Sequence, residues 1–70
     1  KRYRIKELLD RVESGLVSDL KRTIISKLGI DSSQFYRIIN YKQSSRNEAK
    51  PSQLQIIAQE LGCTIDDLMN

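Results

Sequence analysis

The chain of 70 residues has no histidine and no tryptophan, and it has only one cysteine, one proline and three glycines. Without histidine it lacks the usual general base and the commonest metal ligand. The single cysteine, Cys63, excludes an internal disulfide and a cysteine-rich zinc site, and it suits a reducing cytoplasm. There is no glycine-rich phosphate loop and no pair of carboxylates expected on a shared concave face. We therefore expect no enzymatic activity, no cofactor and no metal.

Long apolar runs are also missing, because no run exceeds three residues. Such runs are too short for a membrane span, and no segment has the pattern of a signal peptide. The chain is short enough to form one domain, residues 1–70, with a thin core. The sequence thus predicts a cytoplasmic protein with no membrane partner.

Charge is unevenly distributed along the chain. All twelve basic residues lie in residues 1–50 together with six acids, whereas residues 51–70 contain three acids and no basic residue. The first part is therefore a candidate for binding a polyanion, and the second part is not.

Apolar residues recur at helical spacing throughout the chain. The stripes predict helices at about 3–14, 18–28, 32–41, 51–61 and 65–69, with a polar loop at 42–50. No segment has the alternation of a strand. The predicted fold class is an all-α, compact bundle of five helices.

Residues typical of helix ends set these bounds. We expect Gly15 to end the first helix in a left-handed conformation and Ser18 to cap the second. Gly29 should end the second helix, and Asp31, followed by Gln34, should cap the third.

The third predicted helix has an unusual outer face. On a helical wheel, Phe35, Ile38 and Ile39 gather on one side, and small hydroxyls, a phenol, an arginine and an amide lie away from it. These outward residues are Ser33, Tyr36, Arg37 and Asn40, and no carboxylate follows the cap. Arginine can pair with guanine, asparagine with adenine and serine with either base. The pattern therefore indicates a helix that reads base edges in DNA.

Basic residues surround this helix. Lys21, Arg22, Lys27 and Lys42 are suited to contacts with DNA phosphates, which position a protein without reading sequence. A second helix that begins at Ser18 would also offer free backbone N–H groups to a phosphate.

Two blocks of sequence resemble a known family. Residues 20–42, LKRTIISKLGIDSSQFYRIINYK, resemble the helix-turn-helix of phage repressor and Cro-like regulators, the XRE type. Residues 51–69, PSQLQIIAQELGCTIDDLM, are similar to the later part of the same domain. With the first helix, the resemblance covers residues 4–69. It implies a lambda-repressor-like bundle of five helices whose third helix enters the major groove.

The resemblance also implies roles for individual residues. The base-reading positions of the family fall on Ser32, Ser33, Tyr36 and Arg37, and its phosphate contacts fall on Lys21, Asn40 and Lys42. Its members bind double-stranded DNA as homodimers on half-sites about 34 Å apart. We therefore expect a transcriptional regulator that acts as a repressor.

The chain departs from the family at several places. Ile25 stands where the family has a small residue, and the connection between the first two helices is longer than usual. The loop at 42–50 is also longer and adds Arg46 and Lys50, from which we expect only non-specific attraction to phosphates.

Two questions stay open from the sequence. A protein-interaction module, such as an antitoxin-like adaptor, would have the same fold without strong DNA binding. Leu68 and Met69 could close the core or contribute to a dimer contact. Tyr3 and Tyr41 are expected to be half-buried packing residues, and Cys63 a small buried one.

Overall fold

Five α-helices account for most of the chain in the computed structural model, which describes residues 2–43 and 48–69. They are α1 (Ile5–Asp10), α2 (Ser14–Leu28), α3 (Ser32–Asn40), α4 (Pro51–Leu61) and α5 (Ile65–Leu68). The described residues contain no strand, only one isolated antiparallel β-bridge between Tyr3 and Met69. The predicted all-α class with five helices is confirmed.

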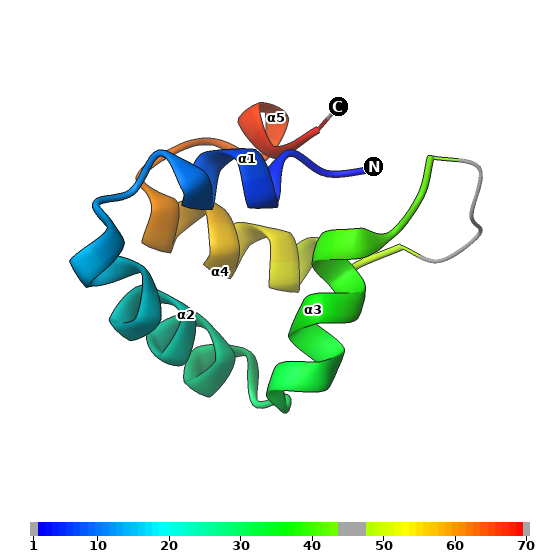
Figure 1. Ribbon diagram of the computed structural model, residues 1–70. Coiled ribbons are helices and arrows are strands. Elements are labelled where there is room, and N and C mark those ends of the chain that lie inside the picture. Colours follow the sequence, from blue (N-terminus) through cyan, green and yellow to red (C-terminus); the bar gives the residue numbers. More distant parts are fainter. Residues whose placement is uncertain (1, 44–47, 70) are drawn as a thin grey trace.

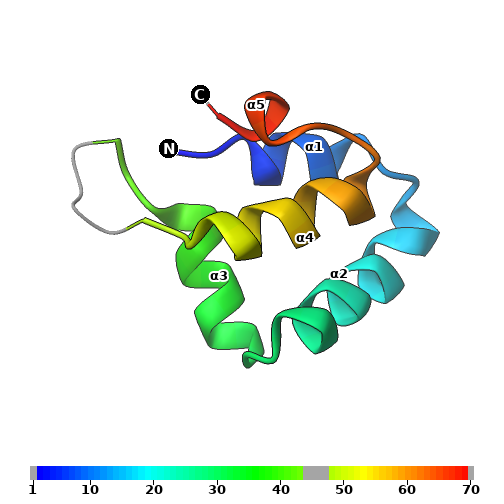
Figure 2. The ribbon, with the colours of Figure 1, turned by 180° about the vertical axis from the view of Figure 1, so that it is seen from behind.

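The helix α4 lies at the centre of the molecule. It packs against α2 and α5, and both ribbon views show α1 and α5 on one side of it and α2 on the other (Figures 1 and 2). The helix α3 stands beside the first turns of α4 (Figure 1).

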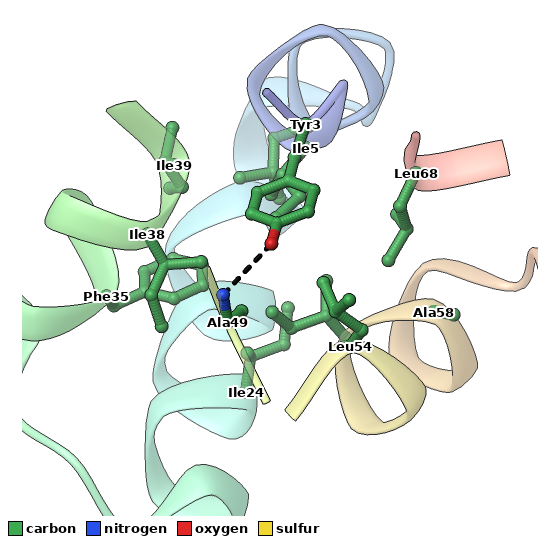
Figure 3. Close-up of a cluster of buried hydrophobic side chains, with 12 residues drawn as sticks. Tyr3, Ile5, Ile24, Phe35, Ile38, Ile39, Ala49, Leu54, Ala58 and Leu68 are labelled. Carbon is green, nitrogen blue, oxygen red and sulfur yellow. Dashed lines mark hydrogen bonds between the residues drawn. The ribbon is translucent and has the colours of Figure 1, made fainter. Parts of the chain in front are cut away.

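The core is formed by the apolar stripes of the helices, which meet around α4 (Figure 3). Burying these side chains is the main stabilising contribution to a domain of this size. The buried residues are Tyr3, Ile5, Leu9, Ile24, Phe35, Ile38, Ile39, Ala49, Leu54, Ile57, Ala58 and Leu68.

Most of the predicted helix ends are confirmed. Gly29 and Gly62 end α2 and α4 in the left-handed conformation, with φ of 68° and 72°, which glycine adopts without steric cost. The Asp31 carboxylate accepts a hydrogen bond from the Gln34 N–H at 2.8 Å and so caps α3. Pro51 is the first residue of α4, where its missing N–H is not needed.

The cap of α5 is a reciprocal pair. The Thr64 hydroxyl accepts a hydrogen bond from the Asp67 N–H at 3.3 Å, and the Asp67 carboxylate accepts one from the Thr64 N–H at 3.0 Å. The hydrogen bonds from the Thr64 backbone and side chain hold the pKa of Asp67 below its usual value, because they favour the charged carboxylate.

The prediction for the first helix is too long at both ends, since α1 covers only Ile5–Asp10. Residues 2–4 instead pair with distant backbone: the Arg2 N–H donates to the Tyr41 carbonyl and the Arg4 N–H to the Leu68 carbonyl, each at 2.7 Å. Tyr3 is consequently buried rather than half-buried.

The prediction for the start of the second helix is wrong. The helix α2 begins at Ser14, so Gly15 lies in its first turn, and Ser18 lies inside the helix and caps nothing. The physical reason is that Val17 continues the apolar stripe of Leu20 and Ile24 by one helical turn towards the N-terminus, and it is half-buried. The long connection expected between the first two helices is therefore mostly helix.

The C-terminal residues divide between two environments. Leu68 is fully buried and closes the core, whereas Met69 follows α5 and is 45% exposed. Tyr41 is half-buried against the core, as expected, whereas Cys63 is half-buried and not buried as expected. Burial and the nearby charge of Asp67 raise the pKa of the Cys63 thiol, so the thiol stays protonated at neutral pH.

Candidate nucleic-acid interface

The candidate interface is built on the turn between α2 and α3. Only Gly29, Ile30 and Asp31 separate the two helices, and the left-handed Gly29 lets the chain change direction sharply, so that α3 leaves at a steep angle to α2 (Figure 1). Ile30 is half-buried against the core and anchors the turn.

The helix α3 has one buried face and one exposed face, as the sequence predicts. Phe35, Ile38 and Ile39 are buried. The side chains expected to read bases all lie on the exposed part of the helix, which we call the outer face of α3: Ser32, Ser33, Tyr36, Arg37 and Asn40. The carboxylate of Asp31, the only acid at this helix, is engaged in the N-cap.

Tyr36 connects the two helices. Its side chain is 46% exposed, its ring lies 6.1 Å from the ring of Phe35 in a tilted arrangement, and the ammonium group of Lys21 in α2 lies 5.3 Å from its ring centroid. This distance is within the range of a cation–π contact. The contact places a positive charge from α2 at the edge of the outer face of α3.

Arg37 and Asn40 differ in how they are held. No acid in residues 2–43 or 48–69 forms an ion pair with the exposed Arg37, and none of its five N–H donors is hydrogen-bonded to a described residue. The Asn40 side-chain amide donates to the Tyr36 carbonyl at 2.8 Å. That bond uses one of its two N–H groups and fixes its position on the last turn of α3.

The predicted phosphate contacts have different surroundings. Arg22 and Asp19 form an exposed ion pair at 3.7 Å, and a pair of this kind is weak enough to open. Lys42 is exposed just after α3. Lys27 is instead paired with Glu60, so this ion pair connects α2 to α4.

Two other expectations change. The N–H groups of residues 18–21 lie inside α2 and form helical hydrogen bonds, so they are not free for a phosphate. In the loop, Lys50 is exposed and forms the N-cap position of α4, whereas Arg46 lies outside the described residues.

Sequence reasoning missed a pocket beside this surface. It has a volume of about 270 Å³ and lies between α1, α2 and α3. Lys21, Tyr36 and Asn40 line one side of it, and Val12 and Val17 line another. The helical spacing of Val17 with Leu20 and Ile24 is the signal that would have extended α2 and formed this wall.

Metal-binding clusters and membrane-spanning helices are both absent from the described part of the chain. No group of three or more histidine, cysteine, aspartate or glutamate residues there could hold a metal ion. None of the helices in it is long and apolar enough to cross a membrane.

Comparison of the chain with protein-family models, with curated proteins and with solved structures finds no match in any of the three. What the chain does is therefore inferred from its residues and their geometry.

Proposed function

We propose that this chain is a sequence-specific domain that binds double-stranded DNA through a helix-turn-helix of the phage repressor and Cro-like type and regulates transcription. The observation that supports the proposal is the outer face of α3, where exposed groups that can pair with bases occur without a competing carboxylate. In this proposal α3 enters the major groove and α2 lies across the DNA backbone.

The residues of α3 have different roles in base recognition. Arg37 is the principal reader, because its guanidinium forms no ion pair with a described residue and can bind the O6 and N7 of guanine together. Ser32 and Ser33 are short and lie at the start of α3, so they allow the helix backbone to come close to the base edges. Tyr36 contributes from the side next to α2.

Contacts to phosphates come from the residues around α3. Lys21 and Arg22 of α2 and Lys42 after α3 supply positive charge, and Asn40 supplies its remaining N–H group. Such contacts determine how the domain sits on the duplex, and they make binding dependent on salt.

The proposal extends to assembly and location. Two copies would occupy half-sites about 34 Å apart on a two-fold operator, and repression would follow from that occupancy. The proposal also places the protein in the cytoplasm, where a single free cysteine stays reduced.

The proposal is tested by selecting bound duplexes from a random pool with the wild-type chain and with Arg37→Ala. We expect wild type to enrich one motif and the variant to lose preference at one base pair, with a loss of about 1–3 kcal/mol in binding free energy. Arg11→Ala is the matched control, because it removes one exposed arginine outside the α2–α3 unit.

The alternative, a protein-interaction module with this fold, gives a different result. It predicts that no motif is enriched and that no complex forms with any duplex even at low salt, where attraction to phosphates is strongest. Either of these outcomes would refute the DNA-binding proposal.

A further inference from the structure

The pocket between α1, α2 and α3 has the composition of a small-molecule site. Leu9 and Ile39, which are buried, and Val12 and Val17, which are half-buried, give it an apolar lining. Its volume of about 270 Å³ lies just under the range of about 300–1,000 Å³ typical of ligand pockets. A compact ligand of roughly ten heavy atoms would suit this volume.

The charges at the rim indicate the sign of the ligand. Lys6 and Asp10 both line the pocket and pair with each other at 3.9 Å, so their charges offset. Lys21 also lines the pocket, is half-buried, and forms no ion pair with any acid in the described residues. The rim therefore has one positive charge in excess, which matches one negative charge on a ligand.

We propose that this pocket binds a small carboxylate with a compact apolar body, such as an aromatic acid, with the carboxylate at Lys21 and the body against Leu9, Val17 and Ile39. Tyr36, whose ring lies under the Lys21 ammonium, forms the wall beside the carboxylate. The site shares Lys21 and Tyr36 with the proposed DNA interface and does not include Ser32, Ser33 or Arg37.

Binding is measured by following the methyl and amide NMR resonances of the chain during titration with sodium benzoate. We expect saturable shifts at Leu9, Val17 and Ile39, with a dissociation constant on the order of 1 mM for so small a ligand. Benzamide, which has the same shape without the charge, should bind about tenfold more weakly. Acetate, which has the charge without the ring, should produce no saturable shifts at these three residues.

Variants test the two halves of the site separately. Lys21→Gln should weaken benzoate binding about tenfold and leave benzamide binding unchanged, and Val17→Phe should fill the pocket and abolish binding of both. Lys27→Gln is the matched control, since it removes a charge from α2 outside the pocket. The amide spectrum of each variant shows whether the fold is retained.

Three results would overturn the proposal. They are an absence of saturable shifts with benzoate, equal affinity for benzoate and benzamide, and shifts of the pocket methyls on dilution without ligand, which would show that a second copy of the chain occupies the pocket. The titration needs no DNA, so it can fail or succeed independently of the proposed function. If both hold, the shared Lys21 and Tyr36 imply that ligand and DNA weaken each other's binding.

Discussion

Tyr3 shows how a single side chain ties distant parts of this small domain together. Its ring is buried in the core, and its hydroxyl accepts a hydrogen bond from the Ala49 N–H at 2.9 Å, just before α4 (Figure 3). The neighbouring Arg2 donates to the Gln43 carbonyl at 3.3 Å and pairs with Glu48 at 3.2 Å. The N-terminal segment thus holds both flanks of the loop between α3 and α4.

Replacing Tyr3 with phenylalanine tests this role. Tyr3→Phe leaves the buried Ala49 N–H without its acceptor, which costs about 1–3 kcal/mol in the free energy of unfolding measured with urea. Tyr41→Phe is the control, because the hydroxyl of the half-buried Tyr41 makes no hydrogen bond to a described residue. Equal stabilities of the two variants would contradict the structural role given to the Tyr3 hydroxyl.

At the scale of elements, α2 begins four residues earlier than the sequence predicts, at Ser14 and not at Ser18. A glycine after an apolar stripe predicts a helix end at Gly15, and this pattern holds at Gly29 and Gly62 but not here. The difference cannot be read from glycine alone, because it depends on whether the next apolar residues continue the stripe. Val17, Leu20 and Ile24 do continue it, and packing of that stripe overrides the local signal of Gly15.

Two glycine substitutions test whether Gly15 lies inside α2 or marks the end of the preceding helix. Gly15 is helical, and a Cβ atom at this position would have no other heavy atom within 4 Å. Gly15→Ala should therefore stabilise the fold by about 0.5 kcal/mol. Gly29→Ala places a side chain at φ of 68° and should destabilise it by about 1 kcal/mol. Thermal unfolding should show opposite shifts in Tm for the two variants. A loss of stability in Gly15→Ala would instead support the shorter second helix predicted from the sequence, which begins after Gly15.

The buried face and the cap of α3 can be predicted from the sequence for physical reasons, whereas the pocket cannot. The periodicity of Phe35, Ile38 and Ile39 and the Asp31 cap act within one helix, so spacing is enough to predict them. The pairing of residues 2–4 with Tyr41 and Leu68, and the pocket walls from three helices, arise between segments far apart in the chain. Spacing carries no information about such contacts.

The cap of α5 gives a dependence of stability on pH. Because hydrogen bonds in the folded chain lower the pKa of Asp67, its contribution to stability is complete above the pKa of the unfolded chain and is lost as pH falls through the lower folded value. Asp67→Asn should therefore be less stable than wild type at pH 7, and the difference should disappear at strongly acidic pH. Urea unfolding from pH 7 to pH 2 measures this difference.

Asp66→Asn is the control for the loss of one charge from α5, since Asp66 takes no part in the reciprocal cap. If the free energies of unfolding of wild type and Asp67→Asn differ by the same amount at pH 7 and at pH 2, the charge of the carboxylate does not contribute to the cap.

At the scale of the whole molecule, basic and acidic residues are concentrated in different parts of the chain. The basic residues lie before α4, whereas α4 and α5 carry only acids. If DNA binds the basic part, Arg46→Gln with Lys50→Gln should lower the slope of log affinity against log salt by up to about two. The preferred sequence should not change, because these residues are expected to meet only phosphates.

The matched control for that double variant is Lys6→Gln with Arg11→Gln, which removes two positive charges at α1, where both are paired with acids. A change in the selected motif would contradict the assignment of Arg46 and Lys50. Mobility-shift titrations at several salt concentrations, combined with selection from a random pool, measure both quantities.

The bridge between Tyr3 and Met69 brings the two ends of the described chain together at one edge, and both ribbon views place that edge opposite the turn between α2 and α3 (Figures 1 and 2). An affinity tag, a fluorophore or a fused partner attached at either end consequently emerges from the same place, away from that turn. Immobilising the domain by one end therefore leaves the α2–α3 turn directed towards the solution, which suits surface-based assays of binding.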